Sequence, residues 1–272
     1  AADCIGCLTT KENLKRFMSS LPDIPTVLIA AQMDGYSSAT FDNKSGIIGG
    51  LEYLIKKSGI TRFGMLSGPP GNHDVDERVE TFYEVMKKHG LEVSDKAFVE
   101  TNLTTYSQKE AAQLLDQNPD IEAIFCINDS VALALYEVMK NRGMEPGRDI
   151  MVMGFDNSPG SAMVSPSLST VDANAVELGK YTYQLIMKLL KGEKVGQETI
   201  PTRFIRRESF GSTFSKSEKG AGVYLNPDIL DIHFNRVFYR YLSIEEKDRS
   251  RLRMKYIMLM NKLIDHINVG LE

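Results

Sequence analysis

The sequence predicts an α/β protein built on parallel sheets. Short apolar runs alternate with amphipathic stretches from the N-terminus to about residue 208. The amphipathic stretches are long enough to be helices, so the alternation indicates βαβ units, whose strands are parallel. The chain has 272 residues, 42% of them apolar, which is enough to bury a substantial core.

Strands are expected where apolar residues run together between turn-forming residues. The run at 150–155 is the last strongly apolar one, and a loop rich in Ser, Pro and Gly is expected after it. The expected strands are 3–7, 26–30, 38–41, 62–66, 97–99, 121–127, 150–155 and 202–206.

Helices are expected where apolar residues recur every three or four positions, which places them on one helix face. Val75, Val79 and Phe82 show this spacing. Gly143 gives one helix a typical C-terminal stop. The expected helices are 11–20, 46–57, 74–89, 107–117, 129–141 and 174–190.

Composition argues against several classes of protein. The net charge of −4 lacks the basic excess of a dedicated nucleic-acid binder. We found no apolar run long enough to span a bilayer and no secretory signal at the N-terminus. Three cysteines without a disulfide framework favour a reducing compartment. We therefore expect a cytoplasmic protein that contacts neither membrane nor nucleic acid directly.

Two motifs invite a metal or redox interpretation. Cys4 and Cys7 form a C-x-x-C pair, but a zinc site needs further ligands, and strand residues three apart point to opposite faces. The acidic cluster from His73 to Glu77 opens a helix, where the dipole favours acidic residues anyway. Neither a phosphate-binding P-loop nor a nucleophile elbow is present. We expect no metal, no cofactor and no catalytic activity.

In parallel sheets, ligands bind beyond the carboxyl ends of the strands. The residues that follow the expected strands are therefore the first candidates for a binding site. They are 68–78, Asn128, Asp129, Asp156 and Asn157.

Three segments, in this order and spacing, resemble the sensor domain of the LacI/GalR family. They are 63–69, 123–133 and 147–157, and residues 205–209 are similar to the end of that domain. The resemblance covers about residues 3–209. It implies a two-lobed, type I periplasmic-binding-protein-like fold with the ligand in a cleft between the lobes.

The resemblance also implies ligand contacts. Arg78 falls where the family has an arginine that binds hydroxyls or carboxylates, and Asn128 where it has a ligand-facing asparagine. Asp156 matches the acid that accepts hydrogen bonds from sugar hydroxyls. Leu103 and Tyr106 lie where many members have an aromatic platform for the sugar, but Leu103 is not aromatic, which puts a sugar-stacking site in doubt.

Each polar candidate also has a purely structural interpretation. Arg78 can pair with Asp74 or Glu77 on its own helix. Asn128 can cap the helix that follows it, and Asp156 can close an Asx turn. The sequence alone leaves these alternatives open.

The resemblance further implies the domain organisation. The N-terminal lobe is expected to comprise 1–60 and 172–195, and the C-terminal lobe 61–171 and 196–209. Family members begin with two more βα units, so the first lobe is expected to be incomplete at its N-terminus. A fragment of a longer protein, or completion by a partner chain, explains this, and we favour the fragment.

Past the resemblance, 210–225 is polar and glycine-containing and is expected to be a linker, and 226–272 a helical extension. Capping patterns begin helices near Asn226 and Ser243. The second helix is expected to take part in self-association as a homodimer, through a coiled-coil-like seam, although docking on its own lobe explains the seam nearly as well. The seam residues are Leu252, Tyr256, Leu259 and Leu263.

The combined hypothesis is a sensor that binds a small polar metabolite, sugar or sugar-like, between its lobes. Lobe closure would signal to a fused output domain, for which the resemblance offers GGDEF diguanylate cyclases as an example. Two alternatives are the effector-binding core of a LacI-type repressor lacking its DNA-binding head, and a solute-binding protein of a transporter.

Overall fold

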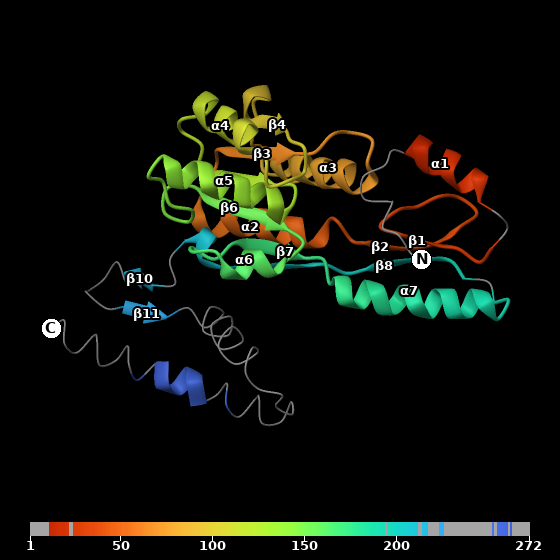
Figure 1. Cartoon of the computed structure of the whole chain (residues 1–272). Helices are drawn as coiled ribbons and strands as arrows, with labels where there is room; N and C mark the ends of the chain where they lie inside the picture. The colour runs from red at the N-terminus through yellow and green to blue at the C-terminus, as the bar shows by residue number, and fades with distance from the viewer. Residues whose placement is uncertain are drawn as a thin grey trace.

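The computed structural model describes residues 11–21, 24–193, 195–211, 214–216 and 223–225, and, nearer the C-terminus, 252, 255–260 and 262. Two mostly separate sheets organise this part of the chain (Figure 1). All strand pairings within them are parallel except one, between β7 and β9. The predicted α/β class with mostly parallel sheets is confirmed.

The larger sheet has six strands in the order β4-β3-β5-β6-β7-β9. Apolar, fully buried runs such as Phe63–Ser67 form its centre, as expected of strands covered on both faces. The strands are β3 (Phe63–Ser67), β4 (Phe98–Glu100), β5 (Ala123–Cys126), β6 (Met151–Phe155), β7 (Ser169–Asp172) and β9 (Arg203–Ile205).

Helices cover both faces of this sheet. Met153 and Gly154 are successive residues of β6, so they face opposite ways. A Cβ on Gly50 of α2 would meet Met153, whereas a Cβ on Gly154 would meet Asp129 of α5, so α2 and α5 lie on opposite faces. α3 packs beside α2 and α4 beside α5. The helices are α2 (Ser45–Ser58), α3 (His73–Lys88), α4 (Gln108–Gln117), α5 (Asp129–Asn141) and the short α6 (Pro159–Met163).

The smaller sheet has the order β1-β2-β8 and is parallel throughout. Val27 and Ile29 of β1 face Leu178 of α7, whereas Leu28 faces Leu14 of α1. Figure 1 shows α7 and α1 on the two sides of this sheet. The elements are α1 (Lys11–Ser20), β1 (Val27–Ile29), β2 (Ser37–Phe41), α7 (Ala175–Leu190) and β8 (Gln197–Ile200).

The chain crosses between the two sheets three times, and the crossings are tied together. The Thr202 hydroxyl, between β8 and β9, donates to the carbonyl oxygen of Asp42 at 2.6 Å and accepts from the amide of Gly46 at 3.2 Å. Asp42 follows β2, so two crossings are joined directly. Arg203 and Asp172, 3.2 Å apart, join the third, from β7 to α7.

Several elements differ from the sequence-based expectation. Helix α2 packs on β7 and β9 of the six-stranded sheet, although its residues precede the lobe boundary predicted after residue 60. The segment expected to be a loop after 155 contains α6 and β7. β7 (Ser169–Asp172) was not predicted because it is too polar to show an apolar run. β8 was missed for the same reason. Strand β9 pairs antiparallel rather than parallel.

The predicted linker and extension are described only in part. Two short strands, β10 (Phe214–Lys216) and β11 (Val223–Leu225), pair antiparallel within the segment predicted as a linker. Residues 255–260 are helical, within the second predicted helix. The predicted strand 3–7, with Cys4 and Cys7, and the first helix of the extension lie outside the described residues.

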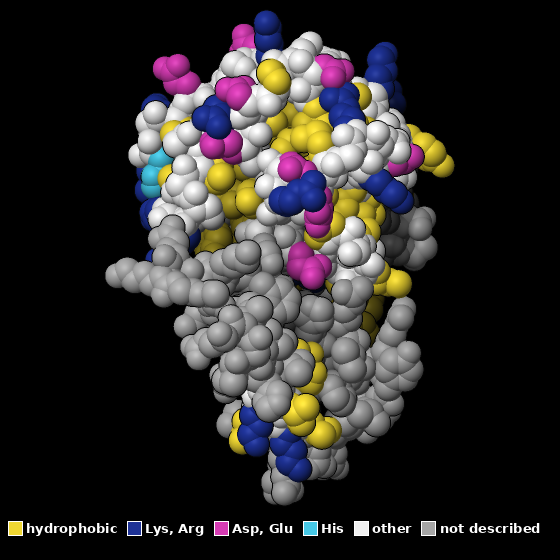
Figure 2. All heavy atoms as spheres, turned by 90° about the vertical axis from the view of Figure 1, so that its left-hand side faces the viewer, with side chains coloured by type: hydrophobic (Ala, Val, Ile, Leu, Met, Phe, Trp, Pro, Cys, Tyr) yellow, Lys and Arg dark blue, Asp and Glu magenta, His cyan; other side chains and the backbone are white. Residues whose placement is uncertain are grey.

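The surface of the described residues carries charges of both signs. On the face shown in Figure 2, Lys and Arg side chains are interspersed with Asp and Glu. Within the described part of the chain, no helix is long and apolar enough to cross a bilayer. The described residues on the face in Figure 2 thus show Lys and Arg mixed with Asp and Glu, not an extended area of a single charge sign.

Gly147 tests how closely the loop before β6 packs against the backbone of Glu208, near the end of the C-terminal lobe. Its φ is +82°, and a Cβ there would lie 2.1 Å from the backbone oxygen of Glu208. Gly143 has φ +70° with nothing within 4 Å of an added Cβ. We expect Gly143→Ala to cost about 1–2 kcal/mol from backbone strain alone and Gly147→Ala at least about 2 kcal/mol more, from the clash. Equal losses in urea unfolding would contradict this packing.

Candidate functional site

The carboxyl ends of β3, β5 and β6 meet at one edge of the six-stranded sheet, because β5 pairs in parallel with both β3 and β6. Three of the predicted ligand contacts follow these strands. Arg78 lies on α3, after β3, while Asn128 and Asp156 come just after β5 and β6. The topology therefore gathers them at one edge, as the sequence predicts.

Arg78 is buried, with 7% of its surface exposed. Its Nε donates to Oδ1 of Asn43 at 2.9 Å, and its Nη1 donates to the carbonyl oxygen of Ile127 at 2.9 Å. The guanidinium carbon lies 3.5 Å from the centre of the Phe155 ring. A buried charge is costly unless it is hydrogen-bonded and paired, and these contacts also fix the orientation of the guanidinium plane.

Asn43 joins the smaller sheet to this cluster. It follows β2, is 1% exposed, and its amide nitrogen donates to Asp74 at 2.9 Å and to Glu77 at 3.0 Å. With its oxygen accepting from Arg78, one amide satisfies two carboxylates and a guanidinium. Asn43 thus stands between Arg78 and the acidic residues that the sequence suggested as direct partners of the arginine.

Asp156 lies beside Arg78, with Oδ1 3.9 Å from Nη1. About half of its side chain, 48%, is exposed at the sheet edge. Burial raises the pKa of Asp156 to about 6, and the attraction of Arg78 opposes that rise while Asp129 and Asp74 add to it. The residue has φ +107°, outside the usual range of a non-glycine residue.

The other predicted contacts are held differently. Asn128 caps α5, accepting from the amide of Val131 at 2.8 Å, while its side-chain nitrogen donates to the carbonyl oxygen of Leu103 at 3.0 Å. Leu103 has φ +65° and packs partly buried against the core. Tyr106 is 81% exposed. Arg78 and Asp156 are therefore together, Asn128 and Leu103 are joined beside them, and Tyr106 stands out in solvent.

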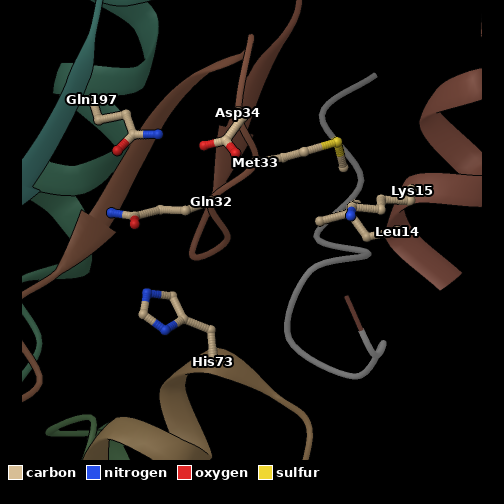
Figure 3. A pocket seen from close by; sticks show the side chains of 7 residues that line it. All are labelled: Leu14, Lys15, Gln32, Met33, Asp34, His73 and Gln197. Atoms are coloured by element: carbon tan, nitrogen blue, oxygen red, sulfur yellow. The ribbon is translucent and has the colours of Figure 1, made fainter. Parts of the chain in front are cut away.

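A cavity of about 310 Å³ opens where α3 begins, between the two sheets. Figure 3 shows Gln32, Asp34 and Gln197 grouped on the side of the smaller sheet, with His73 of α3 reaching toward them. The residues Leu14, Lys15, Gln32, Met33, Asp34, His73 and Gln197 line it.

None of the predicted contacts lines this cavity, but the two groups are connected. His73 lies 3.9 Å from Glu77, and Glu77 accepts from Asn43, which holds Arg78.

Sequence reasoning missed Asn43 and the cavity side chains of the smaller sheet. Asn43 directly follows Asp42 and the strand β2, so the rule that ligands bind beyond strand ends could have indicated it. Gln32 and Asp34 follow β1 in the same way. His73 drew attention only as part of an acidic cluster. Among the residues that the structure describes, no group of three or more His, Cys, Asp or Glu could hold a metal ion.

The fold and this site define a class of binding protein. A model of the periplasmic binding protein-like domain matches residues 51–210, so the chain belongs to that family. Within it, the chain is of the LacI/GalR type, as its sequence motifs indicate and as its relatives are.

Three relatives illustrate the match. The ribose operon repressor of Escherichia coli K12 is 27% identical over 71% of this chain and 59% of its own length. A regulator from Alkaliphilus metalliredigens, solved with D-xylulofuranose, superposes with a TM-score of 0.64 and 24% identity over 70% of this chain and 72% of its own. A lac repressor dimer on its operator gives 0.67 and 20%, over 75% and 62%. The chain thus spans about three fifths of the length of the ribose repressor.

The raised pKa of Asp156 predicts a pH-dependent effect on stability. Its folded pKa of about 6 exceeds the ordinary 3.8, so ionisation destabilises the folded state as pH rises from about 4 to 6. Asp156→Asn removes this titration, so its free energy of unfolding relative to the parent should rise between pH 4.5 and 7 and then level off.

Urea unfolding across this pH range measures the effect. Asp149→Asn is the control, because the pKa of Asp149 is lowered by Arg148 and its ionisation is complete below the window. A parallel pH dependence of the two variants would show that Asp156 titrates normally.

Proposed function

We propose that the chain is the effector-binding core of a LacI-type transcription regulator and binds a sugar or sugar-like molecule between its lobes. The observation that carries this is the pair Arg78 and Asp156, which α3 and the end of β6 bring within 3.9 Å of each other. Buried Asn43 holds the arginine from the side of the smaller sheet. The proposal agrees with the sugar seen in the Alkaliphilus regulator and with the ribose operon repressor.

The chemistry of the pair suits a polyol. The two hydrogen bonds of Arg78 use Nε and Nη1, so Nη2 remains to donate to a ligand hydroxyl. Asp156 in its ionised form accepts from two hydroxyls. Gln32, Gln197 and Asp34 at the cavity supply further donors and acceptors from the opposite sheet. Such convergent polar groups are what a hydroxyl-rich ligand requires.

The ligand would act by favouring one arrangement of the lobes. A molecule that contacts both Arg78 and the side chains on the smaller sheet binds most tightly when the lobes are close. Asn43 lies on the crossing from β2 to α2 and is hydrogen-bonded to side chains of α3, among them Arg78. A displacement of this crossing would therefore also displace Arg78. Closure of the lobes would then be the signal that the regulator transmits.

The repressor-type relatives favour this role over the fused signalling sensor first expected from the sequence. No comparison supports a GGDEF output domain. The complete gene separates the two: a helix-turn-helix encoded upstream supports the regulator, and an output domain downstream supports the sensor. Residence in the cytoplasm belongs to the same proposal.

Calorimetry with a panel of D-ribose, D-xylulose, cellobiose, nucleosides and amino acids tests the function. We expect a sugar to bind, and Asp156→Asn to weaken its binding at least about tenfold, because a neutral amide accepts hydroxyl donors less strongly. Asp120→Asn, at an exposed site away from the cleft, is the matched control and should bind like the parent. Binding by none of the sugars, or equal binding by Asp156→Asn and the parent, contradicts the proposal.

We also propose that the chain associates as a homodimer. The solved lac repressor is a dimer. Leu259 of the predicted seam is 69% exposed, so it is accessible to a second copy of the chain. We expect sedimentation to give a dimer for the whole chain. If truncation after residue 222 leaves that dimer intact, the extension has no part in assembly; a monomer before and after truncation contradicts the dimer itself.

A further inference from the structure

The turn after β6 is strained at two successive residues. Asp156 has φ +107° and Asn157 has φ +53°, both in the region that favours glycine. Strain of this kind persists only where the surroundings impose it. The turn matters because it carries the carboxyl group that faces Arg78.

Buried side chains hold the backbone of this turn. The amide of Ser158 donates to Asp129 at 2.7 Å, and the amide of Asn157 donates to the Thr170 hydroxyl at 3.3 Å. That hydroxyl in turn donates to Asp129 at 2.6 Å. Asp129 is 1% exposed and Thr170 is fully buried. Two elements, α5 and β7, therefore fix the turn from inside the lobe.

Arg207 fixes the same turn from the end of the domain. It is 6% exposed, and its Nη2 donates to Oδ1 of Asn157 at 2.6 Å. Its Nη1 is anchored by the carbonyl oxygen of Leu168 at 2.7 Å and the Ser161 hydroxyl at 2.9 Å. The positive charge of Arg207 also opposes the rise in the pKa of Asp129 that burial causes. The guanidinium thus ties the strained Asn157 to the rigid core.

We propose that Arg207, acting through Asn157, is a positioning residue that holds the Asp156 carboxyl group facing Arg78 for ligand binding. The proposal rests on the proposed function for its meaning, but the geometry it describes exists without ligand. A purely structural Arg207 would stabilise the lobe without affecting Asp156. The experiment must therefore report on Asp156 itself as well as on stability.

The chain offers a matched pair of asparagines. Asn157 has φ +53° and accepts from Arg207. Asn174 has nearly the same φ, +52°, but stands at the start of α7 with no side-chain cap bond. Replacing either by alanine imposes the same left-handed strain, whereas only Asn157→Ala removes the bond from Arg207. Asn157→Asp keeps an acceptor for the guanidinium.

The measurement is the titration of the Asp156 carboxyl carbon by NMR in the ligand-free chain, with D-ribose affinity by calorimetry as the second readout. The charged groups facing Asp156 are Arg78, Asp129 and Asp74, and its pKa in the parent is about 6. In Asn157→Ala the carboxyl group should move toward solvent, shifting the pKa down by about one unit toward the ordinary 3.8 and weakening D-ribose binding about tenfold or more. Asn157→Asp keeps an acceptor for Arg207 and should restore the D-ribose affinity.

Asn174→Ala should lose less stability than Asn157→Ala, because it loses no bond from Arg207, and it should leave the titration of Asp156 and the D-ribose affinity unchanged. If Asn157→Ala also leaves the titration unchanged, Arg207 is a structural residue and the proposal is overturned. If D-ribose does not bind the parent, the titration alone decides: a downward shift in Asn157→Ala that Asn174→Ala does not share upholds the positioning role, whereas the choice of ligand under the proposed function fails separately.

Discussion

The hydrogen bonds of one buried amide connect the two halves of the fold. Asn43 follows the strand β2 of the smaller sheet, yet its side chain bonds to Asp74, Glu77 and Arg78 on α3. Without it, the buried Asp74 and Arg78 would each lose a hydrogen-bond partner, which is costly away from water. The orientation of Arg78 therefore depends on the path of the chain between the sheets, and so does any ligand that the arginine binds.

A second constraint comes from backbone conformation. The turn at Asp156 and Asn157 has φ values that are unfavourable for residues other than glycine, so surrounding groups must hold it in place. Asp129, Thr170 and Arg207 do so with buried hydrogen bonds. Both halves of the Arg78–Asp156 pair are thus held by residues that would not themselves touch a ligand, which is how binding sites achieve accurate geometry.

Much of the fold follows from local patterns. The helix expected over 129–141 has those bounds in the structure, because Asn128 caps its start and Gly143 follows its end. β7 and β8 escaped detection because polar residues such as Ser169 and Gln197 interrupt any apolar run. Arg78 and Asp156 could be predicted as site residues from the sequence, because both follow expected strands. Asn43 could not be assigned its role, since its partners lie 31 to 35 positions away and only the tertiary fold brings them near.

The ties among the crossings bear on how the lobes can move. Thr202 bonds to Asp42 and Gly46, so a displacement of the segment after β2 would carry the segment after β8 with it. Rotation about a pivot displaces atoms in proportion to their distance from it. Arg78 is hydrogen-bonded directly to Asn43, the residue after Asp42, so it would move less than groups farther from the crossings. Under the proposed function, lobe closure would therefore move the cavity side chains Gln32 and Asp34 relative to Arg78.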